Sequence, residues 1–312
     1  MTDVSKLVWS ETFENATVGA DLYSCPPIRT CKQSQIVEHD GRKYGITGIR
    51  KGQSGYGDWG FTIRGQDFDD TKVGDEIWWS QEMYFPEDFD FWTDHGSLKL
   101  FRIGKVNQSG DNRGCVDVQI RSGDQDWRAI VEFANDDVSW ETFTGGKVEK
   151  GKLQRFECYV YLHPTNGIIR MYLDGELFGE SSRRCTMNND ERLLRVLLCT
   201  YWNNGSNGSP ATQTMLLGEG YIAIKNDKRD DSQYLDDDGH GNKYIGVNFG
   251  GEPVDPPVEP PVEPPVEPPV DPVEPPTLPG IDPGDKMATM QVHENKVFVY
   301  TNLPVTIVPS SE

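Results

Sequence analysis

Three polar side chains alternate along one expected strand, at Asp117, Gln119 and Arg121. Successive side chains of a strand point to opposite faces, so these three share one face. An arginine binds a carboxylate through paired hydrogen bonds, and a glutamine binds a hydroxyl. The pattern predicts a surface for a ligand that carries both groups. The alternative is that Asp117 and Arg121 only form an ion pair across the sheet.

Aromatic side chains are abundant, with 8 Trp, 12 Tyr and 13 Phe. In a β protein most of them belong to the core, but exposed rings also stack on sugars. Trp140 and Trp202 adjoin expected loops, at 136–140 and 202–206. We therefore expect these two rings to contact a sugar, whereas the other tryptophans are expected in the core.

Residues 236–242 read Asp-Asp-Asp-Gly-His-Gly-Asn. This order of acids and glycines is similar to the start of a calcium loop, in which Asp236, Asp238 and Asn242 would supply the oxygen ligands. The bidentate glutamate expected further along is missing, so a plain acidic turn is the favoured interpretation. Zinc-ligand spacing is absent, and no motif requires a cofactor.

The elements that must position these residues are short strands separated by Gly, Asp and Asn clusters. They predict an all-β, two-sheet antiparallel sandwich over residues 1–250. The expected strands are 7–13, 59–64, 76–85, 98–103, 115–121, 128–133, 154–162, 168–173, 193–201 and 220–225.

The composition changes after residue 250. Residues 251–286 contain an acidic Pro-Pro-Val-Glu repeat, which predicts a semi-rigid polyproline II linker of about 3.1 Å per residue. Residues 287–312 contain two apolar runs, 296–300 and 304–308, expected as short strands. A segment this short cannot bury its own core, so we expect it to attach to a partner assembly. The alternatives are an inert tail and an unstructured terminus.

The formal net charge is -20; eleven acids and two lysines after residue 250 account for -9, leaving -11 on residues 1–250. Such a field excludes nucleic acid and anionic membranes as partners. We see no membrane-spanning run and no signal-peptide core, so we expect a virion surface or release by lysis, and otherwise a cytoplasmic protein. Cys25 and Cys31 are either a small disulfide loop or two free thiols; Cys115, Cys158 and Cys199 are expected as buried thiols.

Several blocks together resemble the jelly-roll polysaccharide lyases that cleave alginate or glucuronan. They are a strand ending in Phe-Pro-Glu-Asp-Phe-Asp, a Gly-containing loop leading into Lys-Leu, paired strands ending in Asp-Gly, and two closing strands. These blocks are residues 75–91, 95–100, 151–162, 166–175, 197–202 and 220–224. The resemblance covers about residues 5–250 and implies a concanavalin-like jelly roll that faces a carbohydrate.

The resemblance also implies a site for β-elimination, which removes the proton beside a uronate carboxylate. The family's lysine maps onto Lys99, His95 is a candidate base, and Gln119 and Arg121 would hold the substrate. The chain departs from the family at 129–133, where Ala-Ile-Val-Glu-Phe replaces a Tyr-x-Tyr pair. We consider Tyr159, Tyr161 and Tyr201 as substitutes for that pair and as sugar contacts.

Three functions remain open at this stage. The first is a polysaccharide-recognising protein of a virus particle, such as a phage adhesin or depolymerase. The second is an active lyase that acts on a uronate polymer. The third is a structural decoration protein whose jelly roll binds only other proteins.

Overall fold

A computed structural model describes residues 2–20, 28–30, 35–54, 61–63, 71–91, 97–121, 126–132, 138–203, 208–246, 288–293 and 296–301. The chain divides into two compact units, Met1–Glu252 and Pro253–Glu312. His95, the Cys25–Cys31 pair and the 251–286 linker lie outside the described residues. Cys115 and Cys158 are buried, as predicted.

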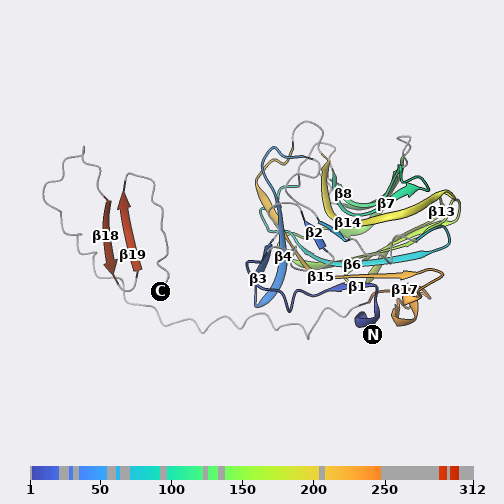
Figure 1. Cartoon of the computed structure of the whole chain (residues 1–312), viewed down its shortest axis with the longest axis horizontal. Helices are drawn as coiled ribbons and strands as arrows, with labels where there is room; N and C mark the ends of the chain where they lie inside the picture. Colours follow the sequence, from blue (N-terminus) through green and yellow to red (C-terminus); the bar gives the residue numbers. More distant parts are fainter. Residues whose placement is uncertain are drawn as a thin grey trace. The chain divides into compact units, whose positions relative to one another are not determined.

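The first unit is an antiparallel sandwich of two sheets, which confirms the predicted fold class (Figure 1). Sheet A runs in the order β13 (Glu176–Arg184), β12 (Gly167–Leu173), β11 (Leu153–Tyr161), β6 (Glu76–Tyr84), β15 (Gln213–Lys225), β4 (Arg42–Ile49), β3 (Gln35–His39), and β1 (Trp9–Glu11) also pairs with β15. Sheet B runs in the order β10 (Val138–Lys147), β9 (Asp126–Glu132), β8 (Asn112–Arg121), β7 (Ser97–Asn107), β14 (Glu191–Asn203), β5 (Phe61–Ile63), β2 (Ile28–Thr30).

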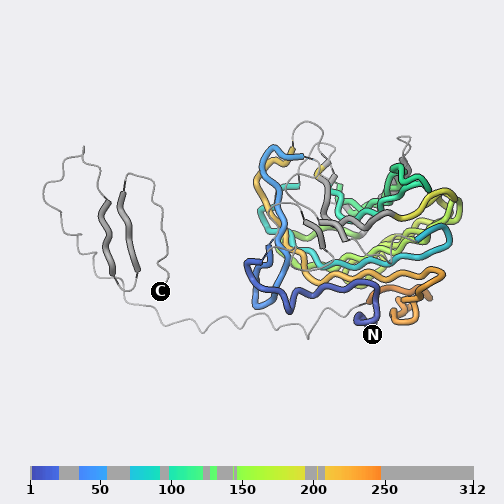
Figure 2. The backbone as a smooth tube through the Cα atoms, in the orientation of Figure 1, coloured from blue at the N-terminus to red at the C-terminus, as the bar shows by residue number. Residues whose placement is uncertain are grey.

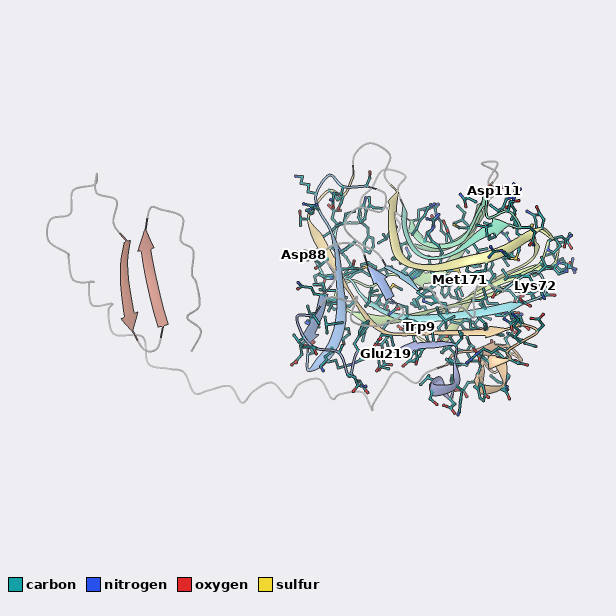
Figure 3. The ribbon with its side chains drawn as sticks, in the orientation of Figure 1. Trp9, Lys72, Asp88, Asp111, Met171 and Glu219 are labelled. Atoms are coloured by element: carbon teal, nitrogen blue, oxygen red, sulfur yellow. The ribbon has the colours of Figure 1, made fainter. Side chains whose placement is uncertain are left out.

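Aromatic rings from the two sheets stack on one another in the core. Trp79 of β6 stacks on Phe101 of β7 with ring centroids 4.4 Å apart. Phe156 of β11 stacks on Trp127 of β9 at 3.9 Å. Figure 3 shows the side chains that fill this space, with the fully buried Met171 labelled. Burial of rings of this size is the main stabilising contribution to such a sandwich.

Sheet B is curved, and its outer face is concave. Figure 1 shows β7, β8 and β14 bending so that their concave side faces away from sheet A. Along β8, Val116, Val118 and Ile120 belong to the core. The residues between them therefore lie on the concave face, because side chains alternate along a strand.

The outer face of sheet A is covered by chain rather than left open. Residues 2–8, with the 3₁₀ turn η1 (Val4–Lys6), and residues 231–246, with η4 (Asp231–Tyr234), β16 (Asp236–Asp237) and β17 (Lys243–Tyr244), lie on it side by side (Figure 2). A second hydrophobic cluster forms beneath them, made of Leu7, Trp78, Tyr159, Tyr221, Ala223, Leu235 and Ile245.

In the second unit, β18 (Ala288–His293) and β19 (Lys296–Thr301) form an antiparallel hairpin. The predicted strand at 296–300 is confirmed, and its partner is 288–293. The other predicted run, 304–308, lies outside the described residues. In the described part of the chain, no helix has the length and apolarity needed to cross a membrane.

The end of the sandwich at β10 and β13 is closed by two reciprocal contacts of phenylalanine with glycine. A methyl group added to Gly146 would lie 2.5 Å from the Phe178 ring, and one added to Gly179 would lie 1.9 Å from the Phe143 ring. The two rings contact each other edge to face. Each ring therefore occupies space that only a glycine leaves free.

We expect Gly179→Ala to lower the free energy of unfolding by about 2 kcal/mol, because the new methyl group forces Phe143 out of its position. Ser182→Ala, an exposed change on the same strand, is the control and should alter stability by less than about 0.5 kcal/mol. Urea denaturation measures both. Equal, small effects would contradict the Phe143 contact.

We expect a chain that ends at Gly250 to melt in one cooperative transition at the temperature of the full chain. The reason is that the described core of the first unit draws on residues 2–246 alone. Calorimetry of the two proteins tests this. Loss of the transition in the shorter chain would mean that the 251–312 segment belongs to the core.

Candidate carbohydrate-binding face

Polar and charged side chains gather on the concave face of sheet B. Asp117 and Gln119 lie there because they alternate with the core residues of β8. Cross-strand pairing places Lys99 beside Gln119 and Arg102 beside Asp117. We call the set Lys99, Arg102, Asp117, Gln119, Arg121 and Arg128 the basic cluster.

An irregularity in β7 puts two cations on this face. The register shifts between Lys99 and Phe101, so Phe101 points into the core while Lys99 and Arg102 both reach Asp117. In a regular strand, residues three positions apart would lie on opposite faces. The bulge therefore creates the pairing of both cations with a single acid.

Asp117 is the hub of the cluster and is fully buried. Its Oδ1 accepts a hydrogen bond from Arg102 Nε at 2.9 Å, and its Oδ2 lies 3.2 Å from Lys99 Nζ. Gln119 Nε2 also donates to Oδ2, at 3.3 Å. A buried carboxylate needs such partners to offset its desolvation.

The cluster continues to two arginines at its rim. Arg128 donates to Gln119 Oε1 at 3.2 Å, and both Arg128 and Arg121 are partly exposed. Burial, together with the nearby charge of Arg121, lowers the pKa of Arg128 to about 10. Four cationic side chains thus accompany one carboxylate within the described cluster. Like charges held this close favour an anion between them.

A second charged cluster, on the outer face of sheet A, provides a contrast. There Arg155 Nη2 lies 2.9 Å from Glu82 Oε1 and 3.2 Å from Glu219 Oε2, and Arg42 Nη2 lies 2.9 Å from Glu82 Oε2. Two arginines face two glutamates, so this cluster is balanced. In the basic cluster of sheet B, the described charged side chains are four cations and one carboxylate.

The structure places only some of the predicted site residues together. Lys99, Gln119 and Arg121 share the concave face as expected. The backbone of Tyr201 pairs directly with Lys99, and that of Trp140 pairs with Ile130. The side chains of Tyr201 and Trp140, and all of His95, lie outside the described residues.

Trp202 does not fit the predicted sugar contact, because it is only 3% exposed and belongs to the core. Its ring lies 6.3 Å from that of Phe89. The backbone of Trp202 pairs with that of Leu98, which is a core residue of β7. Because directly paired residues point to the same face of a sheet, Trp202 also points into the core. The position of Trp202 next to a loop therefore did not indicate an exposed ring.

Tyr159 and Tyr161 are on the wrong sheet to replace the missing tyrosine pair. Both are on β11 of sheet A, and Tyr159 donates a hydrogen bond to Glu76 at 2.8 Å. The Tyr161 ring stacks on that of His163. Neither is near Lys99, because the two sheets enclose the core between them.

The acidic turn at 236–242 uses its oxygens within the protein. Asp238 accepts hydrogen bonds from the backbone of His240 and Asn242, from the Asn242 amide and from the Tyr172 hydroxyl. Asp236 accepts one from the Thr2 backbone at 3.0 Å. Among the described residues, no group of three or more His, Cys, Asp or Glu is placed to hold a metal. The geometry gives no support to the calcium hypothesis.

Sequence reasoning missed Arg102 and Arg128. Arg128 faces Gln119 in the ladder, and the alternation of β9 with the core residues Trp127 and Ala129 was a readable signal for it. Arg102 had no such signal, because its place depends on the bulge after Lys99.

Comparison with solved structures confirms the fold of the jelly-roll polysaccharide lyases. An alginate lyase from Chlorella virus matches with a TM-score of 0.50 and 13% identity, over 64% of this chain and 92% of that one. A marine alginate lyase from Aplysia kurodai gives 0.51 and 13%, over 70% and 99%. An endo-β-1,4-glucuronan lyase from the fungus Trichoderma reesei gives 0.50 and 13%, over 70% and 95%.

The chain therefore has the fold of these lyases. At this identity the likeness establishes architecture and not activity. Comparisons with sequence families and with curated proteins found no match.

We expect Asp117→Asn to lower the free energy of unfolding by about 3 kcal/mol, because it leaves two buried cations without their carboxylate. Asp237→Asn is the matched control. Asp237 is 68% exposed and pairs with Lys243 at the surface, so its loss should cost about 1 kcal/mol or less. Urea denaturation compares the two variants, and equal costs would contradict the role of Asp117 as hub.

Proposed function

We propose that the concave face of sheet B binds a polysaccharide that carries carboxylates, such as a polymer of uronic acids. The observation that carries this proposal is the gathering of cations on this face, above all the closeness of Arg121 and Arg128. A carboxylate placed between two guanidinium groups relieves their repulsion and accepts paired hydrogen bonds from them.

The net negative charge of residues 1–250 opposes the binding of an acidic polymer, and the positive charge of the basic cluster offsets it locally. Residues 1–250 carry -11, which by itself repels an acidic polymer. At physiological salt the general field is screened beyond roughly 8 Å, whereas contacts inside the cluster are not. Binding then depends on the cluster and weakens as salt rises.

Binding without cleavage is the reading that the described residues support best. The described side chains at concave positions of β9 are those of Arg128 and Ile130, and neither has a hydroxyl for proton transfer. β-Elimination remains the second candidate, because the register pairs Tyr201 directly with Lys99. In that case Tyr201 or His95 would move the proton while the cluster neutralises the carboxylate.

We further propose that the domain is displayed on a virus particle, as an adhesin. Support comes from the sugar-facing fold, the proline-rich segment after it and the β18–β19 hairpin, which as an isolated two-stranded unit is only marginally stable in water. A structural decoration protein is the other outcome. Antibody labelling of particles, followed by a glycan array with the purified chain, distinguishes them: an adhesin binds a glycan, and a decoration protein binds none.

We expect Arg128→Gln and Arg121→Gln each to weaken binding of polymannuronate, polyguluronate or glucuronan by about tenfold, the loss of one charged hydrogen-bonded contact. Titration calorimetry on the full chain, at two salt concentrations, measures this.

Lys152→Gln is the control, because it removes one exposed cation from the turn before β11 of sheet A, where Lys152 pairs with Glu149. The affinity of this variant for the uronate polymer should equal that of the natural chain. Equal binding of a neutral glucan, or full binding by both arginine variants, would overturn the proposal. A rise in absorbance near 235 nm during incubation would instead establish the lyase, and Tyr201→Phe should then abolish the rise.

A further inference from the structure

Glu157, in the middle of β11, holds the end of the first unit in place. It lies on the outer face of sheet A and is only 3% exposed. Its Oε2 accepts a hydrogen bond from the backbone of Ile245 at 3.1 Å, and the backbone of Gly246 also donates to this carboxyl. Gly246 is the last described residue before the proline-rich segment.

Other described contacts also attach the segment 235–246 to sheet A, among them the buried Leu235 and the stacking of the Tyr244 ring on that of Tyr172. Ile245 is fully buried in the second hydrophobic cluster. The Trp78 indole donates to the carbonyl of Lys243 at 2.8 Å, and the Tyr172 hydroxyl donates to Asp238 at 3.0 Å. Most of residues 236–244 are exposed or half-buried. Because so much of this segment is open to water, one buried carboxyl contributes substantially to the free-energy difference between its attached and released states.

Three titratable groups face Glu157 from the surrounding elements: Arg155 of β11, Tyr172 of β12 and Tyr244 of β17. Arg155 is also engaged by Glu82 and Glu219. Burial raises the pKa of Glu157 to about 7, against the opposing effects of Arg155, of the two backbone donors and of a hydrogen bond from the Ser80 hydroxyl. The pKa values of both tyrosines are raised above their ordinary value, mainly by burial, so neither ionises near neutrality.

We propose that Glu157 is a pH-dependent latch, which holds residues 235–246 against sheet A in acidic solution and loosens them as the pH rises to neutrality. This proposal is independent of the function proposed above. It would change the point at which the domain is tethered to the proline-rich segment.

The direction follows from linkage. In the attached state Glu157 is buried and keeps its proton up to about pH 7; in the released state it meets water and loses the proton near its ordinary pKa of about 4.3. Between these values only the released state gains charge. The attached state is therefore favoured fully below about pH 4 and loses that advantage progressively up to about pH 7.

Hydrogen exchange on the full chain tests the latch. We expect the protection of the peptide covering 238–246, corrected for the intrinsic exchange rate, to fall by on the order of tenfold between pH 5.5 and pH 8. A peptide from β6, deep in the same sheet, serves as the reference and should change much less. Glu157→Gln keeps an acceptor for the Ile245 amide but cannot ionise, so it should remove the pH dependence.

His240→Gln is the matched control, because His240 is the histidine of the same segment and does not face Glu157. It should keep the pH dependence of the natural chain. Constant protection in the natural chain, or pH-dependent protection in Glu157→Gln, would overturn the latch. If Glu157→Gln does not fold, carboxyl NMR of the natural chain decides: a Glu157 midpoint near 7 supports the latch, and one near 4.3 overturns it.

Discussion

The stacking of large rings between the two sheets is the constraint on which the rest of the structure depends. Trp79 on Phe101, and Phe156 on Trp127, join sheet A to sheet B across the core. Because these rings point into the core, the residues that alternate with them along each strand must point to the outer faces. The chemistry on the outer faces is therefore a consequence of how the core is filled.

The two outer faces solve the problem of buried charge in different ways. On sheet A, arginines and glutamates neutralise one another, and chain segments cover the surface. On sheet B, Asp117 satisfies Lys99 and Arg102, and Arg121 and Arg128 add further positive charge. Breaking a buried pair is costly, so the first arrangement suits a structural role. The second gathers four cations on one face of the described sheet, which is the basis of the proposed carboxylate binding.

Much of the fold could be predicted from sequence, and the errors have identifiable causes. The apolar strands at 76–84 and 153–161 were predicted within a residue of their observed bounds. β13 was missed because it is an edge strand with a mostly polar, exposed pattern, and β4 and β10 because glycines interrupt them. Glycines weaken the strand signal, yet Gly146 and Gly179 are needed for the Phe178 and Phe143 contacts.

The sequence by itself determined the all-β class, the grouping of Asp117, Gln119 and Arg121 on one face, and the change of composition after residue 250, because these depend on local period and composition. Only the tertiary structure decided which cations join them. The bulge in β7 brings Arg102 to Asp117, and Trp202 packs in the hydrophobic core. Both outcomes depend on strand register, which is set by contacts between residues far apart in the chain and leaves no local pattern.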